Sequence, residues 1–362
     1  MLRHRLMPNM AAAFSSGAGL ALLSALLFGA STPLAKVLLL DIDPWMLAGL
    51  LYLGSGLGLL AVKLVVRLLG SGARREAAIQ SGDWMWLALA ILSGGVIGPV
   101  LLMVGLARTA ATSAALLLNL EGVLTALLAW FVFWENFDRR IALGMAAIVS
   151  GGLVLTWGGP LSLSAVLGPV MIAGACLAWA VDNNLTRKVS QTDPVQIALL
   201  KGCVAGVVNV GIAFGLGSAL PPLGVLGAAV VVGFAGYGVS LVLFVVALRH
   251  IGTARTGAYF SLAPFFGGLV AVLVLGEPVT VRIVAAGSLM ALGVWLHLTE
   301  RHEHEHGHEE MAHEHRHAHD KHHQHSHDGT EPPGEPHSHW HVHARLAHSH
   351  AHFPDIHHRH EH

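Results

Sequence analysis

Residues 113–137 read SAALLLNLEGVLTALLAWFVFWENF, an almost uninterrupted apolar run with the carboxylate of Glu121 near its middle and that of Glu135 close to its end. The hydrocarbon core of a bilayer is about 30 Å thick, and a helix needs about 20 apolar residues to cross it. A membrane-spanning strand needs only about 10 residues, which alternate between apolar and polar. The length of the run and its lack of alternation therefore predict a transmembrane helix over roughly 109–134.

Nine runs of the same kind lie on either side of this one. Their connections are short, and turn-forming residues mark most of them, as in Gly158-Gly159-Pro160 and Pro221-Pro222. The pattern predicts an all-α integral membrane protein with ten transmembrane helices. The spans are expected at roughly 17–39, 44–67, 84–107, 109–134, 140–158, 165–187, 195–217, 224–248, 253–276 and 280–299.

The composition is that of a chain surrounded by lipid. Hydrophobic residues make up 54% of the 362 residues and charged residues 12%, whereas soluble domains are about 25% charged. This excludes a soluble enzyme of ordinary composition. The 21 Lys and Arg are balanced by 22 Asp and Glu, which leaves no basic surface for nucleic acid. Cys176 and Cys203 both lie in apolar runs and predict no disulfide framework.

Lys and Arg gather on the cytoplasmic side of membrane proteins. With the N-terminus inside, the inner segments hold twelve of them, whereas the outer segments hold only Arg108 and Arg282. Ten spans return the chain to the side on which it began. We therefore expect both termini in the cytoplasm, and the protein in the plasma membrane, which in bacteria is the inner membrane. The twelve are Arg3, Arg5, Lys63, Arg67, Arg74, Arg75, Arg139, Arg140, Arg187, Lys188, Arg249 and Arg255.

The two halves of the chain are similar to each other. RIALGMAAIVSG at 140–151 matches RIVAAGSLMALG at 282–293, and Glu135 precedes Glu277 by the same 142 residues. Each half holds five spans, and because five is odd, the second half should be inverted in the membrane. Inverted repeats are a transporter architecture, with the substrate site at the repeat interface. The predicted parts are an N-terminus at 1–16, repeats at 17–158 and 165–299, and a tail at 300–362.

Three stretches resemble EamA-type members of the drug/metabolite transporter superfamily. They are the run at 113–137, its counterpart GAYFSLAPFFGGLVAVLVLGEP at 257–278, and SALLFGASTPLAKVLL at 24–39 in the first span. The resemblance covers about 17–299. It implies ten helices in two inverted repeats and a transporter of metabolites, amino acids, nucleotide precursors or drugs.

Glu121 is the strongest candidate for a transport site. An ionisable group at the centre of a transmembrane helix costs about 2.5–3.5 kcal/mol to insert, so such groups mark functional sites. By the 142-residue offset its counterpart is Ala263, and the two positions should face each other across the repeat axis. Pro33, Gly122 (where the family often has Pro) and Pro264 are the predicted hinges or helix breaks. The alternative is a structural carboxyl, hydrogen-bonded to a neighbouring helix.

A second polar group is expected near the inner side. The sixth span carries Asp182-Asn183-Asn184 where the first has Ser31-Thr32-Pro33, which departs from the family pattern. Lys201 enters the seventh span from the same side. Asp182 and Lys201 are expected either to form a buried ion pair that fixes helix register or to face the substrate cavity together, beside Asn183.

Four further residues complete the candidate substrate site, and two interpretations stay open for each. Trp179 and Tyr259 lie deep in their spans, where they line a cavity or pack between helices. Lys36 contacts substrate or extends its ammonium group to the lipid headgroups. Asn119 contacts substrate or bonds a neighbouring helix.

The segment 301–362 holds 23 of the 26 histidines. It has few apolar residues to bury, so we expect it to be disordered without metal. Its 5 basic and 11 acidic residues give a net charge of −6 with neutral His, which rises on mild acidification. Alternating His-x-His suits Zn, Ni or Co, although a low-complexity tail with incidental metal affinity is the alternative. The candidate ligands are His302, His304, His306, His308, His313, His315, His317 and His319.

These features favour a secondary transporter of a small organic metabolite or drug that works by alternating access. The alternative is a divalent-metal transporter (Ni, Co or Zn) whose tail gathers or senses its cargo, but His297 is the only histidine within the predicted spans. No catalytic or phosphate-binding motif occurs in 1–300, so we expect neither an enzyme nor a required cofactor. The expected partners are the lipid bilayer, the substrate and divalent metal ions on the tail, and the chain is a monomer or a homodimer.

Overall fold

The computed structural model describes residues 17–69, 79, 81–133, 139–156, 163–188, 193–251, 253–299, 303–308, 311–317, 337–343 and 346–351. Within these residues, ten helical segments are long and apolar enough to cross a membrane. Each segment begins and ends within a few residues of a predicted span. The prediction of ten transmembrane helices is therefore confirmed, and the described membrane-spanning part is all α.

Six of the described spans are single helices: α2 (Gly17–Leu38), α3 (Pro44–Leu68), α8 (Arg139–Thr156), α9 (Leu163–Lys188), α10 (Pro194–Gly215) and α15 (Val281–Leu298).

The other four spans are interrupted, and they are the third and fourth span of each half. Counted along the chain, the third and eighth spans each contain a π-helical segment. The short 3-10 helix η1 (Ser81–Asp83) precedes the third span. The fourth and ninth each consist of two helices. In chain order the pieces are α4 (Trp84–Ala90), η2 (Ile91–Ile97), α5 (Gly98–Ala107), α6 (Ala111–Leu117), α7 (Leu120–Phe133), α11 (Leu223–Gly233), η3 (Phe234–Val239), α12 (Ser240–Ile251), α13 (Thr253–Phe260) and α14 (Ala263–Leu275).

The second span of each half begins in the same way. The Asp43 carboxylate accepts a hydrogen bond from the backbone N–H of Trp45 at 2.9 Å, and the Asp193 carboxylate accepts one from Val195 at 2.9 Å. Each Asp is followed by a proline, whose fixed φ suits the first helical turn. The Asp-Pro pairs in the sequence therefore mark both helix starts.

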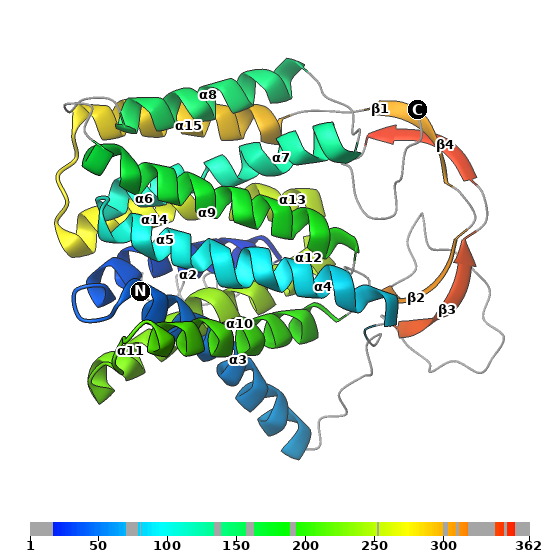
Figure 1. Cartoon of the computed structure of the whole chain (residues 1–362). Helices are drawn as coiled ribbons and strands as arrows, with labels where there is room; N and C mark the ends of the chain where they lie inside the picture. The colour runs from blue at the N-terminus through cyan, green and yellow to red at the C-terminus, as the bar shows by residue number, and fades with distance from the viewer. Residues whose placement is uncertain are drawn as a thin grey trace, which may run out of the picture.

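Helices of the two halves pack in corresponding pairs (Figure 1). The second span of one half packs against that of the other, as α3 with α10, and the fifth spans pair as α8 with α15. The first spans lie centrally: α2 contacts α12 and α14 of the second half, while α9 contacts α5 and α7 of the first. The contacts between helices therefore follow the same two-fold repeat that is seen in the sequence.

Glycines allow the central helices to approach closely. A Cβ on Gly56 of α3 would lie 2.5 Å from the backbone nitrogen of Cys203 on α10. A Cβ on Gly29 of α2 would overlap the carbonyl oxygen of Ala263 on α14. Any larger residue would separate these helices, as at the small-residue contacts typical of membrane proteins.

Four segments of the tail differ from the expectation of disorder. β1 (Glu303–His308) pairs with β4 (Leu346–Ala351), and β2 (Met311–His317) pairs with β3 (His337–His343), both antiparallel. The register places His306 opposite His348 and His315 opposite His339. The physical reason is the His-x-His alternation, whose period of two residues is that of a strand. The strands lie beyond the end of the helices at which α4 begins (Figure 1).

Candidate functional site

The π-helical segments η2 and η3 interrupt the third and eighth spans at corresponding positions. A π-helical turn departs from the regular pattern of backbone bonds, and such turns are frequent at functional sites. In η2 the carbonyl of Gly94 accepts hydrogen bonds from the Tyr52 hydroxyl (2.7 Å) and from the Trp179 indole Nε1 (2.9 Å). The next carbonyl, of Gly95, accepts one from Asn209 Nδ2 (3.1 Å). Side chains from α3, α9 and α10 therefore hold η2 in place.

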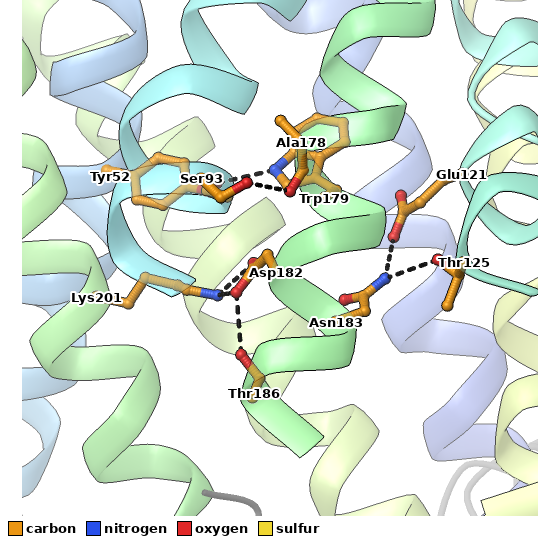
Figure 2. A network of polar contacts seen from close by, with 11 residues as sticks. Tyr52, Ser93, Glu121, Thr125, Ala178, Trp179, Asp182, Asn183, Thr186 and Lys201 are labelled. Atoms are coloured by element: carbon orange, nitrogen blue, oxygen red, sulfur yellow. Dashed lines mark hydrogen bonds and ion pairs between the residues drawn. The ribbon is translucent and has the colours of Figure 1, made fainter. Parts of the chain in front are cut away.

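Asp182 of α9 forms an ion pair with Lys201 of α10 (Figure 2). Lys201 Nζ lies 2.6 Å from Asp182 Oδ1 and 2.5 Å from Oδ2, and the Thr186 hydroxyl donates to Oδ1 at 2.9 Å. The side chains are 18% exposed for Lys201 and 7% for Asp182. The carboxylate also lies against Gly94 of η2, where a Cβ would overlap it. The structure thus shows the buried-pair alternative, in which the two charges neutralise each other.

Asn183 points to the other side of α9 and meets Glu121 of α7 (Figure 2). Its Nδ2 donates to Glu121 Oε1 at 2.9 Å and to Thr125 Oγ1 at 3.5 Å. Asn183 is exposed and Glu121 half-buried. No described atom lies within 4 Å of a Cβ built on the next residue, Gly122. The structure therefore joins two of the predicted site residues beside open space.

The fourth and ninth spans are interrupted near the predicted hinges, but not at the predicted residues. The break in the fourth span lies at Leu118–Asn119, one turn before Gly122, which is inside α7. The break in the ninth span lies at Ser261–Leu262, and Pro264 follows it in the first turn of α14. A proline fits there because its missing N–H costs no helical bond.

Pro33 was expected to be a hinge or break, and this is corrected by the structure, since α2 runs through it from Gly17 to Leu38. Proline removes one backbone bond, and its ring crowds the carbonyl four residues earlier, here that of Gly29. Gly29 is the residue at which α2 lies directly against Ala263 of α14. Packing between these helices therefore outweighs the local effect of the proline.

The remaining candidates within the helices are held by separate contacts. Asn119 lies at the break of the fourth span, donates to the carbonyl of Leu116 at 2.9 Å and approaches Met290 Sδ at 3.9 Å. Trp179 is buried against η2, and Tyr259 is half-buried on α13. Within the described residues, these three make no hydrogen bond to Glu121 or Asn183. For Asn119 and Trp179 the packing interpretation fits best.

Lys36 and Glu277 bind the short turn between α5 and α6, at the predicted outer end. Lys36 Nζ donates to two carbonyls at the end of α5, those of Leu106 (2.6 Å) and the next residue (3.2 Å). Glu277, two residues after the end of α14, accepts hydrogen bonds from the backbone N–H groups of Ala111 (2.7 Å) and Thr112 (2.8 Å) at the start of α6. Each charge meets the helix end of complementary partial charge. The Lys36 ammonium group is therefore bonded to backbone carbonyls of the protein. The headgroup interpretation had expected it to extend to the lipid headgroups.

The metal prediction concerns histidines whose side chains lie outside the described residues, and His302 and His319 lie outside them entirely. Among the described residues, no group of three or more His, Cys, Asp or Glu could hold a metal ion. His297 Nε2 lies 3.1 Å from the carbonyl oxygen of Ile141. Metal binding by the tail therefore stays a prediction.

Ten spanning helices, paired interruptions and polar side chains between the two halves define a membrane transporter built from two repeats. Known proteins agree with this class. The model of the EamA-like transporter family matches the chain twice, over residues 15–157 and 166–299. The chain belongs to the EamA-like transporter family, which confirms the resemblance seen in the sequence.

Individual relatives are transporters as well. An uncharacterized transporter of Methanothermobacter thermautotrophicus is 30% identical over 281 residues, which are 74% of this chain and 82% of that protein. The uncharacterized transporter YyaM of Bacillus subtilis is 25% identical over 66% of this chain and 80% of its own length. A probable 4-amino-4-deoxy-L-arabinose-phosphoundecaprenol flippase subunit ArnE of Pseudomonas paraeruginosa is 41% identical over 104 residues, covering 28% of this chain and 86% of the subunit.

One solved crystal structure shares the fold. It superposes with a TM-score of 0.58 over 78% of this chain and 98% of the other chain, at 18% sequence identity. Such a likeness shows the arrangement of the helices alone.

Proposed function

We propose that this protein is a secondary transporter that moves a small organic solute across the membrane by alternating access. The observation that carries the proposal is the Glu121–Asn183 pair, joined at 2.9 Å across α7 and α9. A carboxylate placed in the middle of a span marks a functional site when it faces the interior of a bundle. Here it lies beside the open space at Gly122.

The paired interruptions support a mechanism in which one half moves against the other. Helix breaks at Leu118–Asn119 and Ser261–Leu262 occupy corresponding places in the two halves, and so do η2 and η3. Alternating access in inverted-repeat transporters is largely a rocking of one repeat against the other around a fixed site. We infer that these four interruptions absorb the change of backbone angle.

The contacts of Lys36 and Glu277 would hold the outer end closed in this conformation. Lys36 joins α2 to the α5–α6 turn within the first half, whereas Glu277, two residues after the end of α14, joins the second half to the same turn. Opening to the outside would require at least one of them to break. An organic cargo is further supported by the flippase subunit relative, which is named for the transfer of a lipid-linked amino sugar.

We propose in addition that the tail binds Zn, Ni or Co and regulates transport. The support is the sequence: 23 histidines lie in 301–362, many as His-x-His, and neutral imidazole suits these metals. His297, which bonds a carbonyl, is the only histidine within the predicted spans, so no histidine ligands lead from the tail into the membrane.

The test is uptake and efflux of a metabolite panel in reconstituted vesicles, with and without divalent metal. We expect at least one organic solute to move, and Glu121→Gln to slow its movement. Asp41→Asn, an equivalent change at an exposed carboxylate between the first two spans, serves as the matched control. Flux of Ni, Co or Zn without movement of any organic solute would overturn the proposal and favour the metal-transporter alternative.

A further inference from the structure

The bonds of the Glu121–Asn183 pair determine which atoms a cargo can reach. An ionised carboxylate only accepts hydrogen bonds, so the amide must turn its NH2 group toward it. Asn183 Nδ2 indeed donates to Glu121 Oε1, and its second, longer contact is to Thr125 Oγ1. The donor side of the amide is thus engaged by α7, whereas the amide oxygen lies on the opposite side of the amide carbon.

Two acceptor atoms are left over. Within the part of the chain that the structure describes, the hydrogen bonds of the pair engage neither Glu121 Oε2 nor Asn183 Oδ1. Both belong to residues with solvent-accessible surface, and the adjacent Gly122 leaves room on the same helix turn. A ligand that enters this space meets acceptors, one of which carries a negative charge.

The charges around the pair do not cancel that of Glu121. Asp182 and Lys201 lie across α9 and neutralise each other at 2.5 Å. Among the described side chains, the other titratable groups nearby are the Tyr52 hydroxyl, which donates to the Gly94 carbonyl, and the Cys176 thiol, which donates to the Leu117 carbonyl at 3.8 Å. Neither group brings a positive charge to the carboxylate.

We infer that Glu121 and Asn183 form an acceptor site for the protonated amine of the cargo. An ammonium group has donors and no acceptor, which matches two open acceptors, and its charge complements the carboxylate. Anionic cargo would place like charges together, and a neutral hydroxyl would leave the carboxylate charge unbalanced. The inference rests on the proposed function, because it names the chemical class of solute that the same site carries.

The experiment uses the full chain in reconstituted vesicles and three probes of matched shape: benzylamine, benzyl alcohol and benzoate. Their efflux is measured for the unaltered protein and for Glu121→Gln, Asn183→Leu and Asn183→Asp. Asp41→Asn is the control, since this carboxylate is exposed in the connection between α2 and α3. Labelling of Gly122→Cys with a water-soluble thiol reagent, in a Cys203→Ala background, reports whether the space at Gly122 is filled with water.

We expect benzylamine to move at least tenfold faster than either other probe, which corresponds to about 1.4 kcal/mol. Glu121→Gln and Asn183→Leu should remove that preference, whereas Asn183→Asp, which adds a second carboxylate, should retain or increase it. Gly122→Cys should react with the water-soluble reagent. Asp41→Asn should leave the preference unchanged.

Three outcomes would overturn the inference while leaving the proposed function intact. The first is preferred movement of benzyl alcohol or benzoate. The second is a Gly122→Cys that reacts only with lipid-soluble reagents, which would place Glu121 toward lipid. The third is a Glu121→Gln variant that loses the pH dependence of transport but keeps the amine preference, which would make the residue a proton carrier only. Movement of metal ions but of no organic solute in the wider panel would instead contradict the proposed function itself.

Discussion

Lys36 and Glu277 bind the opposite ends of a single turn. Lys36 lies 2.6 Å from a carbonyl that ends α5, and Glu277 lies 2.7 Å from an N–H that begins α6. The first residue comes from the first half of the chain and the second from the other half. The turn is therefore stabilised by a contact between repeats.

Glu277→Ala should lower the stability of the protein. It removes both acceptors of the α6 N-terminus, and loss of an N-terminal cap costs about 0.5–2 kcal/mol. Glu277→Gln retains one acceptor oxygen and should cost less. Thermal unfolding of the purified protein in detergent gives the ranking, and equal midpoints for all three proteins would show that these bonds contribute nothing to stability.

Lys36→Met should favour the outward-open state, because it releases α2 from the end of α5. Thr112 lies at the start of α6 and is 2% exposed. A cysteine at this position (Thr112→Cys) should therefore react with a membrane-impermeant reagent added outside only when the outer end opens. We expect faster labelling in the Lys36→Met background. Lys63→Met, at an exposed lysine near the inner end of α3, is the control. Equal labelling rates in the two backgrounds would contradict a closing role for Lys36.

Gly94→Ala should be poorly tolerated. A Cβ at this position would overlap the Asp182 carboxylate, so either η2 or the ion pair would have to move. Gly211 of α10 offers the matched control, since a Cβ there meets nothing within 4 Å. Gly211→Ala should be neutral or stabilising by up to about 1 kcal/mol, as for alanine in a helix interior. Denaturation midpoints that fall equally for both variants would show that the Gly94 contact is not specific.

The sequence predicted the helices well because hydropathy and length alone decide whether a segment spans a bilayer. It also predicted the closeness of Asp182 and Lys201, since both enter from the same side in consecutive spans. It missed the bond between Asn183 and Glu121, because the rotation of α9 against α7 depends on packing between helices. The π-helical segments were missed as well, although Gly94 and Gly236 lie at the 142-residue repeat offset and could have indicated a shared irregularity.

Pro33 shows the limit of local rules. A proline in the middle of an apolar run favours a break, yet α2 remains continuous because its neighbouring turn is packed against α14. In the fourth span the opposite happens: the chain breaks at Leu118–Asn119 without any proline. Tertiary contacts between the repeats, which a single sequence does not display, determine where the helices are interrupted.

Asp182→Asn should destabilise the protein more than the double variant Asp182→Asn/Lys201→Gln. Removal of one partner of a buried ion pair leaves an uncompensated charge and costs about 3–5 kcal/mol, whereas removal of both is often nearly neutral. The Lys201 side chain is only 18% exposed, so water screens its charge poorly. A double-mutant cycle on unfolding free energies measures the coupling, and additive effects would mean that the pair does not interact in the membrane.

Deletion of 301–362 should leave transport of the organic cargo at its basal rate and abolish binding of Zn or Ni. The deleted segment holds 23 of the 26 histidines, and none of the helical contacts described for the site involves it. Binding requires neutral imidazole, so metal occupancy of the full chain should fall as the pH drops through the histidine range near 6.5.

Calorimetric titration of the full and shortened chains with ZnCl2 at two pH values checks the binding, and vesicle efflux with and without metal checks the rate. Since metal would cross-link histidines that are distant in the segment, any metal dependence of the rate should disappear with it. Unchanged zinc affinity after the deletion, or a basal rate that falls with it, would show that the tail is not a separate regulatory segment.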